Sequence, residues 1–347
     1  MTNSSRAIAL ACATLASGMC GLSAHAQSKS KAAKTPQVKF TEYKLANGLR
    51  VILSPDSAAP VIAVSVTYDV GSRNEREGRT GFAHLFEHMM FQGSTNVGKG
   101  EHFVLINDNG GNFNGTTNSD RTNYFETLPA NQLDLALFLE ADRMRGLDIT
   151  QANLDNQRAV VQEERRQSYD NQPYGKAAEM MEELAYKNFA YKHSTIGSMA
   201  DLNAATLQDV KEFFKINYAP NNAVIAVVGD FKLNDAKAKV QKYFGSIPSQ
   251  PAPPKVEVAE SMGEQEQRKS VVDPLARLTR VDVGFKTVAG DDPDYYALSM
   301  LGQIISRGRQ SRLRTAITEK NLAMNAMGMQ RESRGPGLFS FSMTIPP

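Results

Sequence analysis

The segment Gly81-Phe-Ala-His84-Leu-Phe-Glu87-His88-Met-Met-Phe-Gln-Gly-Ser94 carries two imidazoles and a carboxylate with the spacing His-x-x-Glu-His. Successive residues of an α-helix are about 100° apart, so positions i, i+3 and i+4 lie on one face. His84 and His88 can therefore bind one metal ion while Glu87 stands beside it. The other residues of the segment are mainly apolar, and burying three polar side chains among them without a metal or partners would be costly. The pattern predicts a zinc-binding helix; two chance histidines on an amphipathic helix are the alternative.

The order of these residues is the reverse of the H-E-x-x-H motif of other zinc hydrolases. The segment resembles the insulinase/pitrilysin family of zinc peptidases, which includes the mitochondrial processing peptidase. The resemblance implies that His84 and His88 are metal ligands and that Glu87 is the catalytic residue. It also implies a third ligand, a Glu on a second helix further along the chain.

The run NQRAVVQEERR, residues 156–166, is similar to that second helix. The family pattern of apolar residues before the ligand assigns the metal to Glu163, with Glu164 as the alternative. Adjacent helical residues differ by about 100°, so only one of the two carboxylates can face the ion. Many family members carry a further Glu two turns before the ligand, where this chain has Asn156. An ordinary charged helix surface is the alternative interpretation of the pair.

A Gly- and Asn-rich stretch, GGNFNGTT at residues 110–117, precedes DRTNY at residues 120–124. Together they resemble the family's strand pair beside the metal, where an extended substrate adds to the sheet edge. The resemblance implies substrate binding by Asn114, Gly115 and Thr116. Considered without the resemblance, the same letters favour a turn between two strands.

The composition is that of a globular protein, with 41% hydrophobic and 22% charged residues in 347. Lys and Arg number 39 against 37 Asp and Glu, and no basic run is interleaved with aromatic residues. A nucleic-acid partner is therefore not predicted. After the N-terminal segment no stretch reaches the about 18 apolar residues of a membrane span, so the mature chain is predicted to have none.

The N-terminus has the organisation of a secretory signal peptide over residues 1–26. Arg6 precedes an apolar run, and Ala24-His25-Ala26 supplies small residues at a cleavage site before Gln27. A periplasmic or secreted protein follows from this pattern. Both cysteines, Cys12 and Cys20, lie inside the segment, and acylation at Cys12 is the alternative. Residues 27–37 form a polar leader, predicted to be flexible.

The remaining chain predicts an α+β fold: a two-layer arrangement of antiparallel sheet with helices packed on it, because strands and helices are grouped rather than alternating. The turn Asn47-Gly48 predicts a hairpin between its flanking β-rich runs. The expected strands are 40–45, 50–54, 61–68, a pair within 112–128, and 223–229. The expected helices are 80–91, 131–147, 151–169, 176–186, 206–214 and 234–244.

We expect a metal-binding peptidase domain over residues 38–248, a Pro-rich linker over 249–270, and a second homologous domain over 271–347. The second domain has an expected strand at 281–286, helices at 295–306 and 311–320, and an alternating run at 338–345. Family resemblance implies a domain about twice as long, so this repeat is expected to be incomplete.

Two imidazoles and one carboxylate leave a zinc ion one open position, which is the catalytic pattern. The sequence thus predicts a zinc endopeptidase with one Zn²⁺ and peptide or unfolded polypeptide substrates. A non-catalytic assembly or scaffold subunit of the same fold is the alternative. Many family members also carry an Arg and a Tyr that bind the substrate carbonyl, where this chain has Ile317 and Met324. That departure predicts that a homologous partner chain, or a further C-terminal part, supplies the missing groups.

Overall fold

A six-stranded sheet forms the centre of the N-terminal lobe, our name for residues 39–247, with strand order β1-β2-β6-β3-β5-β4. The computed structural model describes residues 37–263 and 265–347. The predicted signal peptide and residues 27–36 of the leader lie outside the described residues. The strands are β1 (Thr41–Lys44), β2 (Arg50–Pro55), β3 (Val61–Tyr68), β4 (Asn112–Thr117), β5 (Thr122–Pro129) and β6 (Ala223–Gly229). All neighbouring pairs are antiparallel except β2 and β6, which are parallel, so the sheet is mixed where an antiparallel one was expected.

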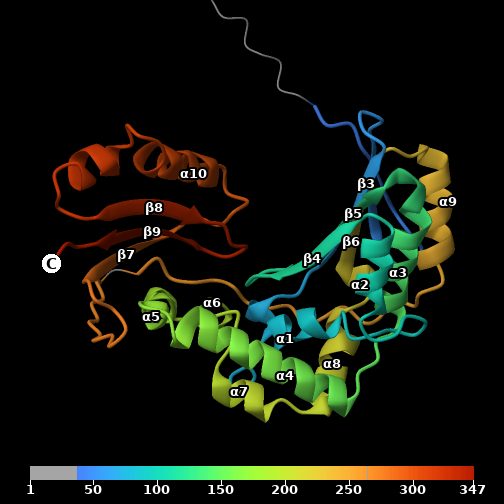
Figure 1. Ribbon diagram of the computed structural model, residues 1–347, viewed down its shortest axis with the longest axis horizontal. Helices are drawn as coiled ribbons and strands as arrows, with labels where there is room; N and C mark the ends of the chain where they lie inside the picture. The colour runs from blue at the N-terminus through green and yellow to red at the C-terminus, as the bar shows by residue number, and fades with distance from the viewer. Residues whose placement is uncertain (1–36, 264) are drawn as a thin grey trace, which may run out of the picture. The chain divides into compact units, whose positions relative to one another are not determined.

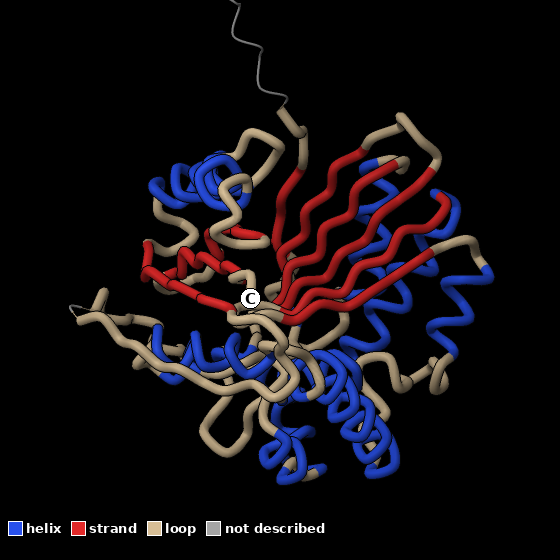
Figure 2. Tube along the Cα trace, turned by 60° about the vertical axis from the view of Figure 1, so that its left-hand side comes forward, coloured by secondary structure: helices blue, strands red, loops and turns tan. Residues whose placement is uncertain are grey.

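The predicted Asn47-Gly48 hairpin is confirmed: β1 pairs with β2, and Gly48 has the positive φ of 93° that the turn requires. Alternate residues of the central strands are buried, among them Val64, Val66 and Tyr124. Helices α3 (Leu133–Arg145) and α9 (Leu233–Phe244) cover that face of the sheet (Figure 1). The strands and the helices behind them form the two expected layers (Figure 2).

A group of helices at one end of the sheet contains the predicted zinc helix, α1 (Phe82–Met89), which packs on α4 (Gln151–Arg165) and on β4. A five-residue π-helical turn, η3 (Arg166–Asp170), continues α4. The other helices of the lobe are α2 (Glu101–Asp108), α5 (Gly175–Ala185), α6 (Phe189–Lys192), α7 (Met199–Ala204) and α8 (Leu207–Asn217), with short 3-10 turns η1 (Ser72–Asn74), η2 (Ala130–Gln132) and η4 (Pro220–Asn222). Helices α2, α6 and α7 were not predicted; α6 and α7 have only four and six residues, too few to show a clear helical period.

The C-terminal lobe, residues 280–347, has a three-stranded antiparallel sheet in the order β7-β9-β8. Its elements are β7 (Arg280–Thr287), α10 (Pro293–Ser306), the π-helical turn η5 (Arg314–Thr318), β8 (Asn325–Arg331) and β9 (Gly337–Thr344). The predicted helix at 311–320 is therefore only a short helical segment, and β8 was not predicted. Helix α10 contacts β8, while α5 contacts β7.

The two lobes share a topology. In the N-terminal lobe a strand, helices and two further strands follow one another as β3, α1, α2, β4 and β5, and the sheet order is β3-β5-β4. In the C-terminal lobe β7, α10, η5, β8 and β9 repeat that succession, and the sheet order is β7-β9-β8. The expected repeated-domain arrangement is thereby confirmed, with the C-terminal lobe repeating part of the first.

The described residues between 248 and 279 contain no helix or strand. Val256 and Val258 of this connection pack against a small cluster of Tyr186, Ala190 and Tyr191. The domain boundaries at 248 and 271 stay predictions. No helix among the described residues has the length and apolar character needed to cross a bilayer.

Candidate metal centre

Helix α1 is preceded by its N-cap residue Gly81, whose backbone conformation a larger residue could not adopt. Its φ is 85°, and a Cβ there would lie 2.6 Å from the carbonyl oxygen of Ile196. The buried carboxylate of Glu75 accepts hydrogen bonds from the backbone N–H groups of Gly81 at 2.9 Å and Ala83 at 2.7 Å. His193 Nε2 lies 3.0 Å from the same carboxylate. Glu75 and His193 thus fix the start of the helix, a role that no sequence pattern indicated.

His84 and His88 stand on the same face of α1, and both Nε2 atoms approach one oxygen of α4. The distances to Glu164 Oε2 are 3.6 Å from His84 and 3.5 Å from His88. These separations are long for hydrogen bonds. They are close to the about 3.3 Å that separates ligands around a tetrahedral zinc ion bound at about 2.0–2.1 Å. The donor set of two imidazoles and one carboxylate fits zinc.

The prediction that Glu163 faces the histidines is wrong. Glu163 lies on the exposed side of α4, where it accepts hydrogen bonds from Arg166 and Gln167, both at 3.0 Å. The reason is the phase of the helix: Leu154, Gln157 and Val161 form its buried face. One further step of three residues along that face reaches Glu164 rather than its neighbour.

The correction also changes which residue stands two turns before the carboxylate. That residue is Gln157, which is buried and contacts His88. Asn156 points elsewhere, and its side-chain oxygen accepts a hydrogen bond from Gln157 at 2.8 Å. An amide therefore occupies the place next to the histidine where many family members have a carboxylate.

The protonation states of the group follow from burial and from the neighbouring charges. Burial, and then the nearby His88, lower the pKa of His84 to about 4. Burial alone would lower the pKa of His88, but its contact with Glu164 and the charges of Glu164 and Glu87 raise it overall. The same contact with His88 lowers the pKa of Glu164. His84 is thus the neutral imidazole, ready to act as a ligand.

Glu87 stands beside the three ligand atoms and faces strand β4. Thr117 Oγ1 donates a hydrogen bond to Glu87 Oε2. A Cβ on Gly115 would lie 2.9 Å from Glu87 Cγ, so the strand packs directly on this side chain. Burial raises the pKa of Glu87, against the opposing hydrogen bond from Thr117. A carboxylate with a raised pKa next to a metal site has the properties of a general base.

The three predicted substrate-binding residues lie on β4, which is the last strand at one edge of the six-stranded sheet. Asn114 is exposed, and its side-chain oxygen accepts a hydrogen bond from the backbone N–H of Gly115 at 2.8 Å. Arg121 donates to both oxygens of Thr116, at 3.0 Å to the carbonyl. The predicted turn between two strands is also present, but it lies at residues 118–121, after these three residues.

A second group of potential ligands lies in the core: His102, Glu126 and Glu140 are all buried. Arg143 Nε donates to Glu140 at 3.0 Å, so this group already contains its own cation. Burial, and then the nearby Glu140, raise the pKa of Glu126 well above its usual range. Burial and Arg143 lower the pKa of His102 to about 2. The group therefore consists of the Arg143–Glu140 ion pair and two side chains, Glu126 and His102, whose shifted pKa values both favour the uncharged form.

Ile317 and Met324 both lie in the C-terminal lobe. Ile317 is half-buried in η5, and Met324 is 57% exposed just before β8. Helix α10 follows β7 as α1 follows β3, but its sequence, PDYYALSMLGQIIS, has no histidine. Among the described residues, the His-x-x-Glu-His arrangement belongs to the N-terminal lobe alone.

Comparisons with known proteins agree with this division. The profile described as Insulinase (Peptidase family M16) matches residues 50–199. The profile described as Peptidase M16 inactive domain matches residues 204–347. The first therefore contains α1 and α4, and the second contains the whole C-terminal lobe.

Curated relatives include the zinc protease PqqE of Helicobacter pylori, which is 32% identical over 325 residues, covering 92% of this chain and 72% of that protein. The probable mitochondrial-processing peptidase subunit beta of Arabidopsis thaliana is 25% identical over 88% of this chain, which spans 59% of that protein's length.

Solved structures agree with the fold. The crystal structure of a protease from Helicobacter pylori has a TM-score of 0.86 and 32% identity, covering 90% of this chain and 76% of that one. A peptidase M16 inactive domain from Pseudomonas fluorescens, at 21% identity, shares the fold with a TM-score of 0.77 over 88% of this chain and 74% of that one. With two profiles that together run from Arg50 to Pro347 and a zinc protease among its relatives, the chain belongs to the insulinase family of peptidases, family M16.

Proposed function

We propose that this chain is a zinc endopeptidase in which His84, His88 and Glu164 hold one zinc ion and Glu87 is the general base. The observation that carries the proposal is the approach of both Nε2 atoms to Glu164 Oε2, with Glu87 beside them on α1. Three protein ligands leave one position for substrate or water, as catalytic zinc sites do. The naming of relatives as zinc proteases supports the same metal.

When bound, zinc would polarise the scissile carbonyl and make a coordinated water more acidic. The chain's own contribution is the proton chemistry. Glu87 accepts the proton of the attacking water at Oε1, since Oε2 already accepts a hydrogen bond from Thr117, and then passes the proton to the leaving amine. Its raised pKa, caused first by burial, favours holding the proton between these two events.

The substrate would bind as an extended strand along β4. That strand forms an edge of the sheet, and an edge strand presents unpaired backbone groups to an incoming peptide. In this arrangement Gly115 supplies the outward-facing backbone groups, and Asn114 exchanges its local bond to Gly115 for one to the substrate. Thr116 lies beside them on the strand, with its carbonyl already bonded to Arg121. Peptides and unfolded polypeptides are the substrates that can add to an edge in this way.

A partner would complete the substrate site. Ile317 and Met324 offer no donor for the carbonyl oxygen of the substrate. We therefore propose that a homologous chain, or a further C-terminal part of this one, supplies donors, whose loss commonly costs about 10²- to 10³-fold in rate. The expected location is the periplasm or the extracellular space, after cleavage of residues 1–26 at Ala26.

The test combines metal analysis with cleavage of a quenched fluorescent peptide by purified residues 27–347, with and without a homologous chain. We expect one zinc ion per chain, and a higher turnover with the homologous chain than without it. Zinc binding without turnover under either condition would instead favour the second candidate, a scaffold subunit. The observation that favours this candidate is the lack of side-chain donors at positions 317 and 324.

A further inference from the structure

The orientation of Glu87 depends on strand β4. Thr117 Oγ1 is the hydrogen-bond donor to its carboxylate, and Gly115 is the surface on which its side chain packs. Thr117 is also the last residue of β4 and directly precedes the turn of residues 118–121. Whatever fixes this turn therefore fixes the donor to Glu87.

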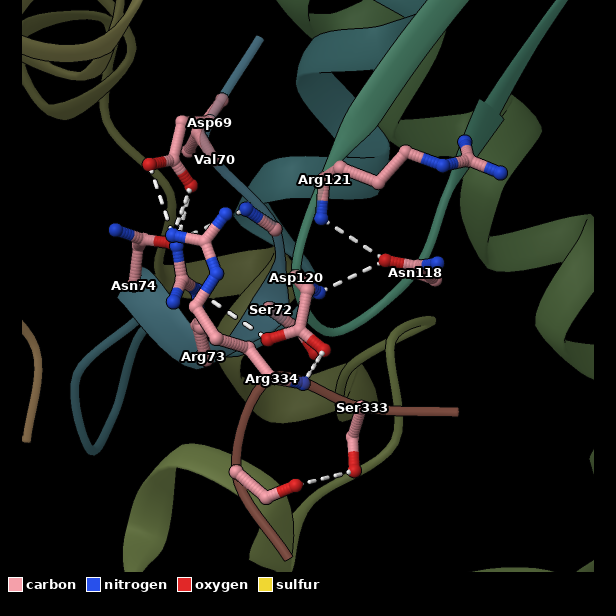
Figure 3. A network of polar contacts seen from close by, with 12 residues as sticks. Asp69, Val70, Ser72, Arg73, Asn74, Asn118, Asp120, Arg121, Ser333 and Arg334 are labelled. Carbon is pink, nitrogen blue, oxygen red and sulfur yellow. Dashed lines mark hydrogen bonds and ion pairs between the residues drawn. The ribbon is translucent and has the colours of Figure 1, made fainter. Parts of the chain in front are cut away.

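The turn has its own hydrogen bonds and also packs on η1. The side-chain oxygen of Asn118 accepts from the backbone N–H groups of Asp120 at 2.8 Å and Arg121 at 2.9 Å. The backbone N–H of Arg73 donates to the carbonyl of Ser119 at 2.9 Å. These bonds hold the turn in one shape, and they leave the carboxylate of Asp120 free to make contacts outside it (Figure 3).

Asp120 joins the turn to two other parts of the chain. Its Oδ1 accepts a hydrogen bond from Tyr191 Oη at 2.7 Å, and its Oδ2 accepts one from the backbone N–H of Arg334 at 2.9 Å. Tyr191 Oη in turn accepts from the backbone N–H of Gly335 at 2.8 Å. Arg73 Nε lies 3.5 Å from Oδ1 as an ion pair. One carboxylate thus connects the turn after β4, helix α6 and the loop between β8 and β9.

The loop of the C-terminal lobe has further bonds at the same place. Arg334 Nη1 donates to Asp69 Oδ2 at 2.9 Å, and Ser333 Oγ donates to the carbonyl of Gly335 at 2.9 Å (Figure 3). The Asp69 pair is half-exposed, whereas the side chain of Asp120 is only 15% exposed. A hydrogen bond to a charged group is stronger when water is excluded, so Asp120 is the stronger of the two links.

We propose that Asp120 is a positioning residue for Glu87: it holds the 118–121 turn against the C-terminal lobe, and thereby keeps Thr117 in place as the donor. The proposal rests on the proposed function of Glu87. It gives the C-terminal lobe a role in catalysis although that lobe has no metal ligands of its own. The connection runs through four successive residues, from Asp120 back to Thr117, and one hydrogen bond.

The experiment compares Asp120→Asn and Tyr191→Phe with matched changes on α9, Asp235→Asn and Tyr243→Phe, in the full chain. We expect Asp120→Asn to lower kcat at least tenfold with KM and zinc content unchanged, and Tyr191→Phe to lower it less. The α9 variants should keep the unmutated kcat. Thr117→Val should lower kcat, and Thr117→Ser, which retains the hydroxyl, should restore it.

A double-variant cycle separates positioning from general stabilisation. If Asp120 acts through Thr117, then Asp120→Asn combined with Thr117→Val has the kcat of Thr117→Val alone; independent effects would multiply. The proposal would be overturned if the effects of the two substitutions multiplied. It would also be overturned if Asp120→Asn had the same kcat per folded molecule as the unmutated chain.

Absence of hydrolysis by the unmutated chain both with and without a homologous chain would refute the proposed function instead. The positioning role of Asp120 is then decided by comparing crystal structures of the unmutated chain and of Asp120→Asn. An unchanged bond between Thr117 and Glu87 in Asp120→Asn would contradict it, and a broken bond would support it.

Discussion

Glu163 and Glu164 are adjacent in α4, yet only Glu164 faces the histidines: its Oε2 lies 3.5 Å from His88 Nε2, while Glu163 pairs with Arg166 at the surface. This arrangement provides a matched pair for testing the metal site, because the same substitution can be made at each position. We expect Glu164→Gln to weaken zinc affinity by more than the about 10- to 100-fold that loss of an outer partner of a ligand costs. Glu163→Gln should bind zinc as the unmutated chain does. Equilibrium titration with a competing chelator measures both, and the reverse ranking would return the ligand to position 163.

Glu87→Gln should remove hydrolysis while leaving zinc bound, because the amide cannot accept the proton of the attacking water. General bases commonly contribute about 10²- to 10⁴-fold in rate, so turnover should fall by at least that factor. His88→Ala should lose both zinc and activity, and is the control for metal loss. Peptide cleavage and metal content are measured on the same preparations; near-normal turnover of Glu87→Gln would contradict the general-base assignment.

Zinc should stabilise the folded chain, because the unfolded chain does not hold the three ligands together. At a free zinc concentration one hundred times its dissociation constant, linkage predicts about 2.7 kcal/mol. Thermal unfolding with and without a chelator should therefore differ by several degrees. His84→Ala should show a much smaller difference between the two conditions. An equal zinc-dependent shift in that variant would mean that the ion stabilises the chain from another site.

Glu126→Gln should remove a loss of stability that the unmutated chain undergoes as the pH rises. Burial raises the pKa of Glu126 well above its usual range, so the folded chain keeps a proton that the unfolded chain releases above about pH 4.3. The stability that this proton provides is complete below that pH and is lost as the pH rises toward the raised folded pKa. Gln resembles the protonated form and has no such loss.

The free energy of unfolding of Glu126→Gln minus that of the unmutated chain should therefore increase by up to about 1.4 kcal/mol per pH unit. Urea unfolding between pH 5 and pH 8 measures the difference. Glu77→Gln, at an exposed position, is the control and should stay parallel to the unmutated chain. A constant difference for Glu126→Gln across this range would show that its carboxyl is already ionised at pH 5.

Local signals were sufficient for much of the fold and for one half of the site. The His-x-x-Glu-His spacing lies within two turns of one helix, and Asn47-Gly48 lies within one hairpin, so each is visible in a short segment. The choice between Glu163 and Glu164 depended on the phase of α4. Leu154 and Val161 carry that phase in the sequence, but Val160 beside them is 43% exposed and obscures it.

Contacts between distant segments could not be predicted in the same way. The bond from Arg334 to Asp120 joins residues far apart in the sequence, and its donor is a backbone N–H that every residue except proline carries. Strand β8 was missed because Gly328 interrupts it and two methionines weaken its alternation. The predicted helix at 311–320 is reduced to the π-helical turn η5, and the positive φ of 56° at Asn321 prevents it from extending further.

The repeated strand order of the two lobes has a consequence for how such a chain can change over time. The two sheets have the same strand order, but among the described residues only the N-terminal lobe carries the His-x-x-Glu-His arrangement. The C-terminal lobe, which has α10 in place of α1, can therefore accept surface substitutions without loss of a metal ligand. The backbone N–H groups of Arg334 and Gly335, which bind Asp120 and Tyr191, must stay in place. Over evolutionary time such substitutions could give the chain new partners while the residues of the metal centre stay unchanged.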